Sequence, residues 1–183
     1  MHRIQKILNF NKKFVETMRY ERYASEKKPQ KKIAVLTCMD TRLVELLPAA
    51  LHFKNGECIL IKNAGALITH AFGSVMRSLL VAVYELGVED IMVVGHYDCG
   101  MQGLDASRMV EKMRERGISE EKFSAANCCG VDLQTWLQGF SSVESSVFET
   151  VKAIKSHPLI PPEIGIYGFI MDPETGKLDE VKN

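Results

Sequence analysis

Apolar and polar positions form blocks along the chain, and the spacing within each block predicts strands and helices in turn. Short runs of consecutive apolar residues predict strands at 33–37, 58–62, 90–95 and 164–171, with a last short strand from Leu178. Apolar residues that recur every three or four positions predict a buried helix at 72–86, while a charged surface helix is expected at 104–116 and further helices are expected at 42–51, 131–140 and 143–155. Apolar strands that alternate with helices are typical of a parallel sheet covered on both faces. We therefore expect an α/β fold with a central, mostly parallel sheet flanked by helices.

The segment before residue 33 departs from this alternation. Its apolar residues mark one stripe of a helix over residues 4–23, with lysine and glutamate on the other side: Ile4, Ile7, Leu8, Phe14, Val15 and Met18. Residues 26–32 (EKKPQKK) are charged and contain Pro29, which predicts an exposed linker. The apolar stripe needs a surface to cover, either on its own domain or on a second subunit.

Length and composition narrow the class of protein. With 183 residues, 46% of them hydrophobic, the chain is expected to form one compact domain over 1–183, with an arm and linker at 1–32 and an α/β core at 33–183. The 23 basic residues balance 23 acidic ones, which argues against a nucleic-acid binder or a protein bound to anionic membranes. Acidic residues also interrupt the most apolar segment, 78–96, so we expect no membrane span.

Cysteine usage points toward a reducing compartment. Five cysteines are too few, and odd in number, for a small secreted disulfide scaffold. The first residues, MHRIQKILNFNKKF, lack the apolar run and cleavage site of a signal peptide. We therefore expect a cytoplasmic protein with reduced thiols, which favours metal binding or thiol chemistry.

Two polar clusters follow two of the predicted strands directly. Residues 38–42 (CMDTR) come after the strand at 33–37, and residues 96–100 (HYDCG) come after the strand at 90–95. In open α/β sheets, active sites gather at the carboxyl ends of the strands. If the two strands are neighbours, Cys38, His96 and Cys99 meet there, and two thiolates with one imidazole are a ligand set that Zn²⁺ favours. Three protein ligands leave a fourth position open, as in catalytic rather than structural zinc sites.

Each of these residues also has a simpler interpretation. A cysteine after a strand is more often a small buried apolar residue than a ligand, and His-x-x-Cys alone is a weak signal. A phosphatase nucleophile at Cys38 is disfavoured, because only three residues and no glycine separate it from Arg42. Asp40 lies within reach of a metal at Cys38, and Arg42 can pair with the Asp40 carboxylate through two hydrogen bonds. The alternative for that pair is an exposed ion pair of little energetic value.

Taken together, three motifs resemble the β-class carbonic anhydrases, in particular the short, compact branch of that family. They are Cys38-x-Asp40-x-Arg42, Asn63-Ala64-Gly65 and Gly95-His96-x-x-Cys99-Gly100-Met101, and the resemblance spans 33–101 and again 166–178. It implies one zinc ion per chain on Cys38, His96 and Cys99, with Asp40 and Arg42 as a catalytic pair beside the open position. It also implies a homodimer or larger homo-oligomer, with the N-terminal helix extending onto a partner subunit.

The implied activity is that of a carbonate dehydratase, the reversible hydration of carbon dioxide to bicarbonate and a proton by a hydroxide at the zinc. Asp40 would accept the hydrogen bond of this nucleophile, and Arg42 would hold Asp40 in place. One alternative is a zinc hydrolase of carbon disulfide or carbonyl sulfide. Another is a non-catalytic, zinc-stabilised binding or regulatory protein, although a purely structural site has no need of the Asp40–Arg42 pair.

Several residues keep more than one interpretation at this stage. The reaction needs a proton shuttle, for which the candidates are His52, His70, Tyr84 and Tyr97. Residues 63–65 form either a simple turn or a loop that lines the site. Cys58 is expected in the core, whereas Cys128 and Cys129 are core residues, surface thiols or a source of a fourth zinc ligand.

Overall fold

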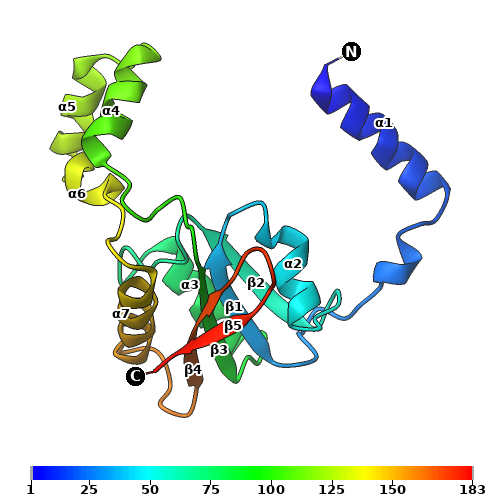
Figure 1. Ribbon diagram of the computed structural model, residues 1–183. Helices are drawn as coiled ribbons and strands as arrows, with labels where there is room; N and C mark the ends of the chain where they lie inside the picture. The colour runs from blue at the N-terminus through cyan, green and yellow to red at the C-terminus, as the bar shows by residue number, and fades with distance from the viewer. Residues whose placement is uncertain (1, 183) are drawn as a thin grey trace.

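A computed structural model describes residues 2–182 and shows a five-stranded sheet flanked by helices (Figure 1). The strands are β1 (Ile33–Cys38), β2 (Cys58–Asn63), β3 (Asp90–His96), β4 (Gly165–Met171) and β5 (Leu178–Val181). Their order across the sheet is β2-β1-β3-β4-β5; the first four are parallel and β5 is antiparallel to β4. The expected α/β fold with a mostly parallel sheet is confirmed.

The two faces of the sheet support separate apolar clusters, because successive residues of a strand point to opposite sides. Ala34 and Leu36 of β1 belong to the cluster that includes helices α3 (Ser74–Tyr84) and α7 (Val143–Lys155). Val35 belongs to the cluster on the other face, with helix α2 (Leu43–Ala50). The central strands are therefore covered on both sides, as their uninterrupted apolar runs predict.

A second group of helices projects away from the sheet, and we call residues 104–138 the helical lobe (Figure 1). It contains α4 (Ala106–Glu115), α5 (Glu120–Cys128) and α6 (Leu133–Leu137). The sequence prediction was wrong about α5, which it omitted, and about 131–140, where the helix is only five residues long. Among the residues of α5 only Phe123 is buried, so the helix has no apolar stripe to reveal it.

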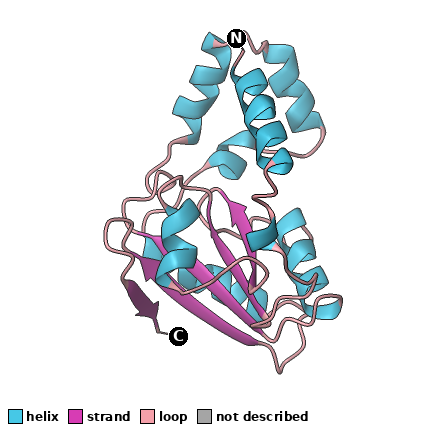
Figure 2. Cartoon of the chain, turned by 90° about the vertical axis from the view of Figure 1, so that its right-hand side faces the viewer, coloured by secondary structure: helices cyan, strands magenta, loops and turns pink. Residues whose placement is uncertain are grey.

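Helix α1 (Arg3–Glu16) stands apart from the rest of the chain (Figures 1 and 2). The helix ends earlier than the apolar spacing predicts, because Met18 adopts a left-handed backbone conformation (φ 53°) and a short 3₁₀ turn follows at Glu21–Tyr23. None of its residues is buried, and Ile7 and Leu8 are 62% and 55% exposed.

Every helix within residues 2–182 is too short or too polar to span a membrane.

Candidate metal centre

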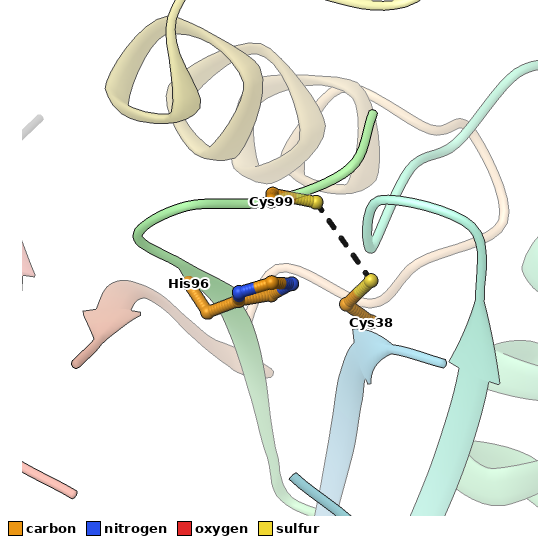
Figure 3. A group of neighbouring side chains, drawn as sticks. All are labelled: Cys38, His96 and Cys99. Carbon is orange, nitrogen blue, oxygen red and sulfur yellow. Dashed lines mark hydrogen bonds between the residues drawn. The ribbon is translucent and has the colours of Figure 1, made fainter. Parts of the chain in front are cut away.

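The strand order brings the two polar clusters together at the carboxyl edge of the sheet. Cys38 is the last residue of β1 and His96 is the last residue of the neighbouring strand β3, while Cys99 lies on the loop that follows β3. The two sulfurs and a ring nitrogen of His96 lie within 4.8 Å of one another, and the Sγ atoms of Cys38 and Cys99 are 3.8 Å apart (Figure 3). All three side chains are buried. The predicted meeting of these residues is confirmed, and the group has the size and donor atoms to bind a metal ion.

Hydrogen bonding leaves one ring nitrogen of His96 available. Its Nδ1 lies 2.8 Å from the Tyr97 carbonyl, and because a carbonyl only accepts, Nδ1 carries the proton and donates. Nε2 is then left with a lone pair, is fully buried, and has no hydrogen-bond partner among the described residues. A buried polar atom without a partner is rare in native proteins and indicates that a bound ion or ligand satisfies it. A metal ion on Nε2 satisfies it, in the manner of histidine ligands whose other nitrogen donates to a carbonyl.

The contact between the two sulfurs shifts their pKa values in opposite directions. The contact with Cys99 is the largest cause, and together with the Gly65 N–H (3.4 Å from Sγ) it outweighs burial and lowers the pKa of Cys38 to about 4. The same interaction, with burial, raises the pKa of Cys99. One sulfur is therefore a thiolate at neutral pH, and a divalent cation would displace the remaining proton.

Asp40 and Arg42 form the predicted pair. Arg42 donates from Nε to Oδ1 (3.1 Å) and from Nη2 to Oδ2 (2.9 Å), and its backbone N–H reaches Oδ1 at 2.8 Å. These hydrogen bonds, chiefly those from the Arg42 side chain, lower the pKa of Asp40 to about 2. Its Oδ2 lies 3.8 Å from Nε2 of His96, so an ionised carboxylate faces the space between the candidate ligands.

A cavity of about 330 Å³ opens beside this group. Cys38, Asp40 and Cys99 line it together with apolar groups of Met39, Ala64 and Met101. A larger cavity of about 580 Å³ lies between residues 69–70 and 130–138, but none of the candidate ligands lines it. Of these two cavities, the smaller one is lined by candidate ligands.

The loop at residues 63–65 supports the centre rather than serving only as a turn. Gly65 has φ +85°, and a Cβ there would lie 3.1 to 3.3 Å from Phe140, Met101 and Leu67. Its N–H points at the Cys38 sulfur, and Ala64 lines the cavity. Asn63 fixes the loop through two hydrogen bonds with the backbone of Leu67, at 2.7 and 3.1 Å.

The four candidate proton shuttles lie elsewhere than on the wall of the 330 Å³ cavity. The Tyr97 hydroxyl donates to Asp179, that of Tyr84 donates to the Leu159 carbonyl, and His70 lines the larger cavity. His52 lies in the turn after α2.

The remaining cysteines are outside the Cys38–His96–Cys99 group. Cys58 is half-buried in β2, whereas Cys128 and Cys129 are exposed at the end of α5. Sequence reasoning missed one residue of the site, Asp98, whose carboxylate accepts from Arg42 at 2.9 Å. Its position inside the His-x-x-Cys motif was the available signal.

Comparison with known proteins agrees with this geometry. The sequence pattern of the family described as Carbonic anhydrase matches residues 33–178. YtiB of Bacillus subtilis (strain 168), whose carbonic anhydrase name is provisional, is 51% identical over 183 residues, covering 100% of this chain and 98% of that protein. A carbon disulfide hydrolase of Acidithiobacillus thiooxidans is 27% identical over 154 residues, covering 81% of this chain and 76% of that protein.

A solved structure extends the match to the whole fold. The crystal structure of β-carbonic anhydrase isoform I from Trichomonas vaginalis aligns with a TM-score of 0.90 and 35% sequence identity, covering 100% of this chain and 99% of that one. The family pattern spans the four parallel strands and the candidate metal centre. The chain therefore belongs to the β-carbonic anhydrase family.

Proposed function

We propose that this protein is a zinc-dependent carbonic anhydrase, a carbonate dehydratase that interconverts carbon dioxide with bicarbonate and a proton. The observation that carries the proposal is the buried Cys38–His96–Cys99 group, whose unpartnered Nε2 lies 3.8 Å from the ionised Asp40 carboxylate. A structural zinc site uses four protein ligands and needs no oriented carboxylate beside it.

The donor set fits one zinc ion per chain. Two sulfurs and one imidazole nitrogen match the ligands that zinc prefers, and three protein ligands leave a position open. When bound, zinc would act as a Lewis acid that makes water a nucleophile near neutral pH.

Asp40 and Arg42 then act as the catalytic pair. Because its pKa is about 2, Asp40 stays ionised near neutral pH, and it acts as an acceptor that orients the nucleophile rather than as a proton store. The fork of Arg42 fixes the direction of the carboxylate. Met39, Ala64 and Met101 give the cavity an apolar wall, which suits a small, uncharged substrate.

Metal content and turnover test the proposal together. We expect about one zinc per chain by elemental analysis and proton release on mixing with carbon dioxide in a stopped-flow assay. Asp40→Ala should retain zinc and lose most of the hydration rate, since it removes the orienting acceptor and no ligand. Freshly purified protein without bound metal would refute the central claim.

Hydrolysis of carbon disulfide or carbonyl sulfide is the second candidate. It is favoured by the relative named as a carbon disulfide hydrolase, and the apolar cavity wall suits an uncharged linear substrate of either kind. Zinc-loaded protein that is inactive toward carbon dioxide at pH 8.5 but releases hydrogen sulfide from carbon disulfide would establish this alternative. Inactivity toward both substrates would favour a non-catalytic, zinc-stabilised binding or regulatory protein.

The proposal extends to the setting of the enzyme. The whole chain, 1–183, acts as a single domain in which residues 33–183 form the core and 1–32 form an arm and linker. The exposed apolar side chains of α1 favour a homodimer or larger homo-oligomer in which α1 lies on a partner subunit. Two reduced thiols at the centre favour a cytoplasmic location.

A further inference from the structure

Arg42 is held between two carboxylates, of which the function proposed above uses only one. On one side Nε and Nη2 donate to Asp40; on the other, Nη1 donates to the Asp98 carboxylate and Nη2 to the Asp98 carbonyl, each at 2.9 Å. Four of the five guanidinium N–H groups are therefore engaged. Because the guanidinium is planar and rigid, fixing its far edge also fixes the edge that faces Asp40.

The backbone of Asp98 is shaped for this contact. Its φ is +52°, in the left-handed region where glycine is the usual residue and aspartate is tolerated. This conformation turns both the carbonyl and the carboxylate toward Arg42. Glycine would make the turn without strain, so the turn alone does not account for an aspartate here.

The two aspartates differ in what they can touch. The Asp40 side chain is 19% exposed and lines the cavity, whereas that of Asp98 is 86% exposed and is not among the lining residues. Asp98 also lies on the loop that joins His96 to Cys99, so its bonds to Arg42 tie that loop to the start of α2. Any influence of Asp98 on a substrate in the cavity must pass through Arg42.

We infer that Asp98 is a positioning residue: it anchors Arg42 from the side away from the cavity and thereby fixes the direction of the Asp40 carboxylate. The expected effect of Asp98 on turnover rests on the proposed function, whereas its effect on the position of Arg42 does not. An exposed aspartate outside the cavity is thus part of the catalytic arrangement.

Three substitutions distinguish the contribution of the Asp98 carboxylate from that of its left-handed backbone conformation. Asp98→Gly keeps the left-handed backbone and removes the carboxylate; Asp98→Asn keeps the turn and an acceptor oxygen for Nη1. Glu163→Gln, an exposed acid before β4 at the opposite edge of the sheet, controls for loss of negative charge. With zinc-loaded proteins we expect kcat to fall about tenfold in Asp98→Gly with KM nearly unchanged, because misplacement of an orienting group costs turnover rather than binding. Asp98→Asn should stay within about threefold of wild type, and zinc content should be equal in all.

A second measurement does not depend on catalysis. In metal-free, ¹⁵N-arginine-labelled protein, the side-chain resonances of Arg42, identified by their loss in Arg42→Lys, should show hindered guanidinium rotation in wild type and Asp98→Asn. They should broaden or average in Asp98→Gly. If wild type binds zinc but does not hydrate carbon dioxide, the proposed function fails and this measurement still decides the role of Asp98. Unchanged Arg42 resonances with unchanged kcat in Asp98→Gly would overturn the inference, as would equal losses of zinc and kcat in the Gly and Asn variants.

Discussion

The sheet and helix α1 differ in where their apolar side chains find partners. Ala34, Val35 and Leu36 of β1 are completely buried within the chain, between clusters on the two faces of the sheet. In α1 no residue is buried, although apolar residues recur along one side of the helix. Burial of apolar area is the main source of folding free energy, so the sheet is stabilised by its own chain and α1 is not.

This difference decides what each region can hold. A metal centre needs ligands fixed to within a fraction of an ångström, and Cys38 and His96 end the paired central strands β1 and β3. The helical lobe, by contrast, carries Cys128 and Cys129 as exposed side chains at the end of a helix with little burial. The cysteines of this chain thus differ in their surroundings, because rigid, buried elements support Cys38 and not Cys128 or Cys129.

Cys38→Ser gives the largest expected effect. Replacing a buried thiolate ligand should abolish stoichiometric zinc binding and with it carbon dioxide hydration, whereas Cys128→Ser on the helical lobe should change neither. Elemental analysis and stopped-flow assays on both variants measure the contrast. Full zinc content in Cys38→Ser, or its loss in Cys128→Ser, would contradict the assignment of the centre.

Leu79→Ala should have the next largest effect, on stability. Leu79 of α3 is fully buried against the sheet, so truncation should lower the free energy of unfolding by about 2–5 kcal/mol. Leu8→Ala in α1 removes contacts that the chain itself hardly makes and should cost less than about 0.5 kcal/mol. Urea denaturation at several protein concentrations measures both changes. A large loss of unfolding free energy in Leu8→Ala that does not depend on protein concentration would mean that α1 packs on its own chain.

The strands and the ligand set were predictable because both depend on local rules. Apolar runs without polar interruptions predict buried parallel strands, and the residues directly after them occupy the carboxyl edge of the sheet. Cys38, Asp40, Arg42, His96 and Cys99 were therefore placed together from the sequence. Asp98 was missed, because its contact with Arg42 depends on the left-handed conformation of one loop residue, which the apolar pattern does not encode.

The helices that contact little else were predicted least well. Helix α5 begins after Ser119 with Glu120 and Glu121, which are typical start signals, but it lacks the apolar spacing on which the prediction depended. The prediction also extended α1 to residue 23, because Met18 continues the apolar stripe while its backbone ends the helix. Hydrophobic periodicity reports burial, and it fails where burial is slight.

Truncation of one apolar side chain of α1 should weaken self-association moderately and change nothing else. If α1 covers a partner subunit, Ile7→Ala should weaken self-association about tenfold, which corresponds to roughly 1.4 kcal/mol. Zinc content per chain should stay the same. Sedimentation velocity over a dilution series measures the change, with Lys12→Ala, at an exposed α1 residue that pairs with Glu16, as the control. Equal association of wild type and Ile7→Ala would remove the reason for placing α1 on a partner.

The smallest expected effect is the acid dependence of stability contributed by Asp40. Its pKa is about 2 in the folded protein, below its ordinary value of 3.8, mainly because Arg42 donates to it. A lowered folded-state pKa stabilises the fold above about pH 4, and this contribution disappears as the pH falls toward 2. Since Asp40 is partly exposed, the contribution should not exceed about 1 kcal/mol.

Asp40→Asn in metal-free protein isolates this contribution. Its difference in unfolding free energy from wild type should shrink between about pH 4 and pH 2. Glu120, on the helical lobe, also accepts from an arginine, Arg114, but its side chain is 70% exposed, so Glu120→Gln should show a weaker pH dependence. An equal pH dependence in both variants would mean that the Asp40–Arg42 pair at the end of the sheet contributes no more to stability than the exposed Glu120–Arg114 pair does on the helical lobe.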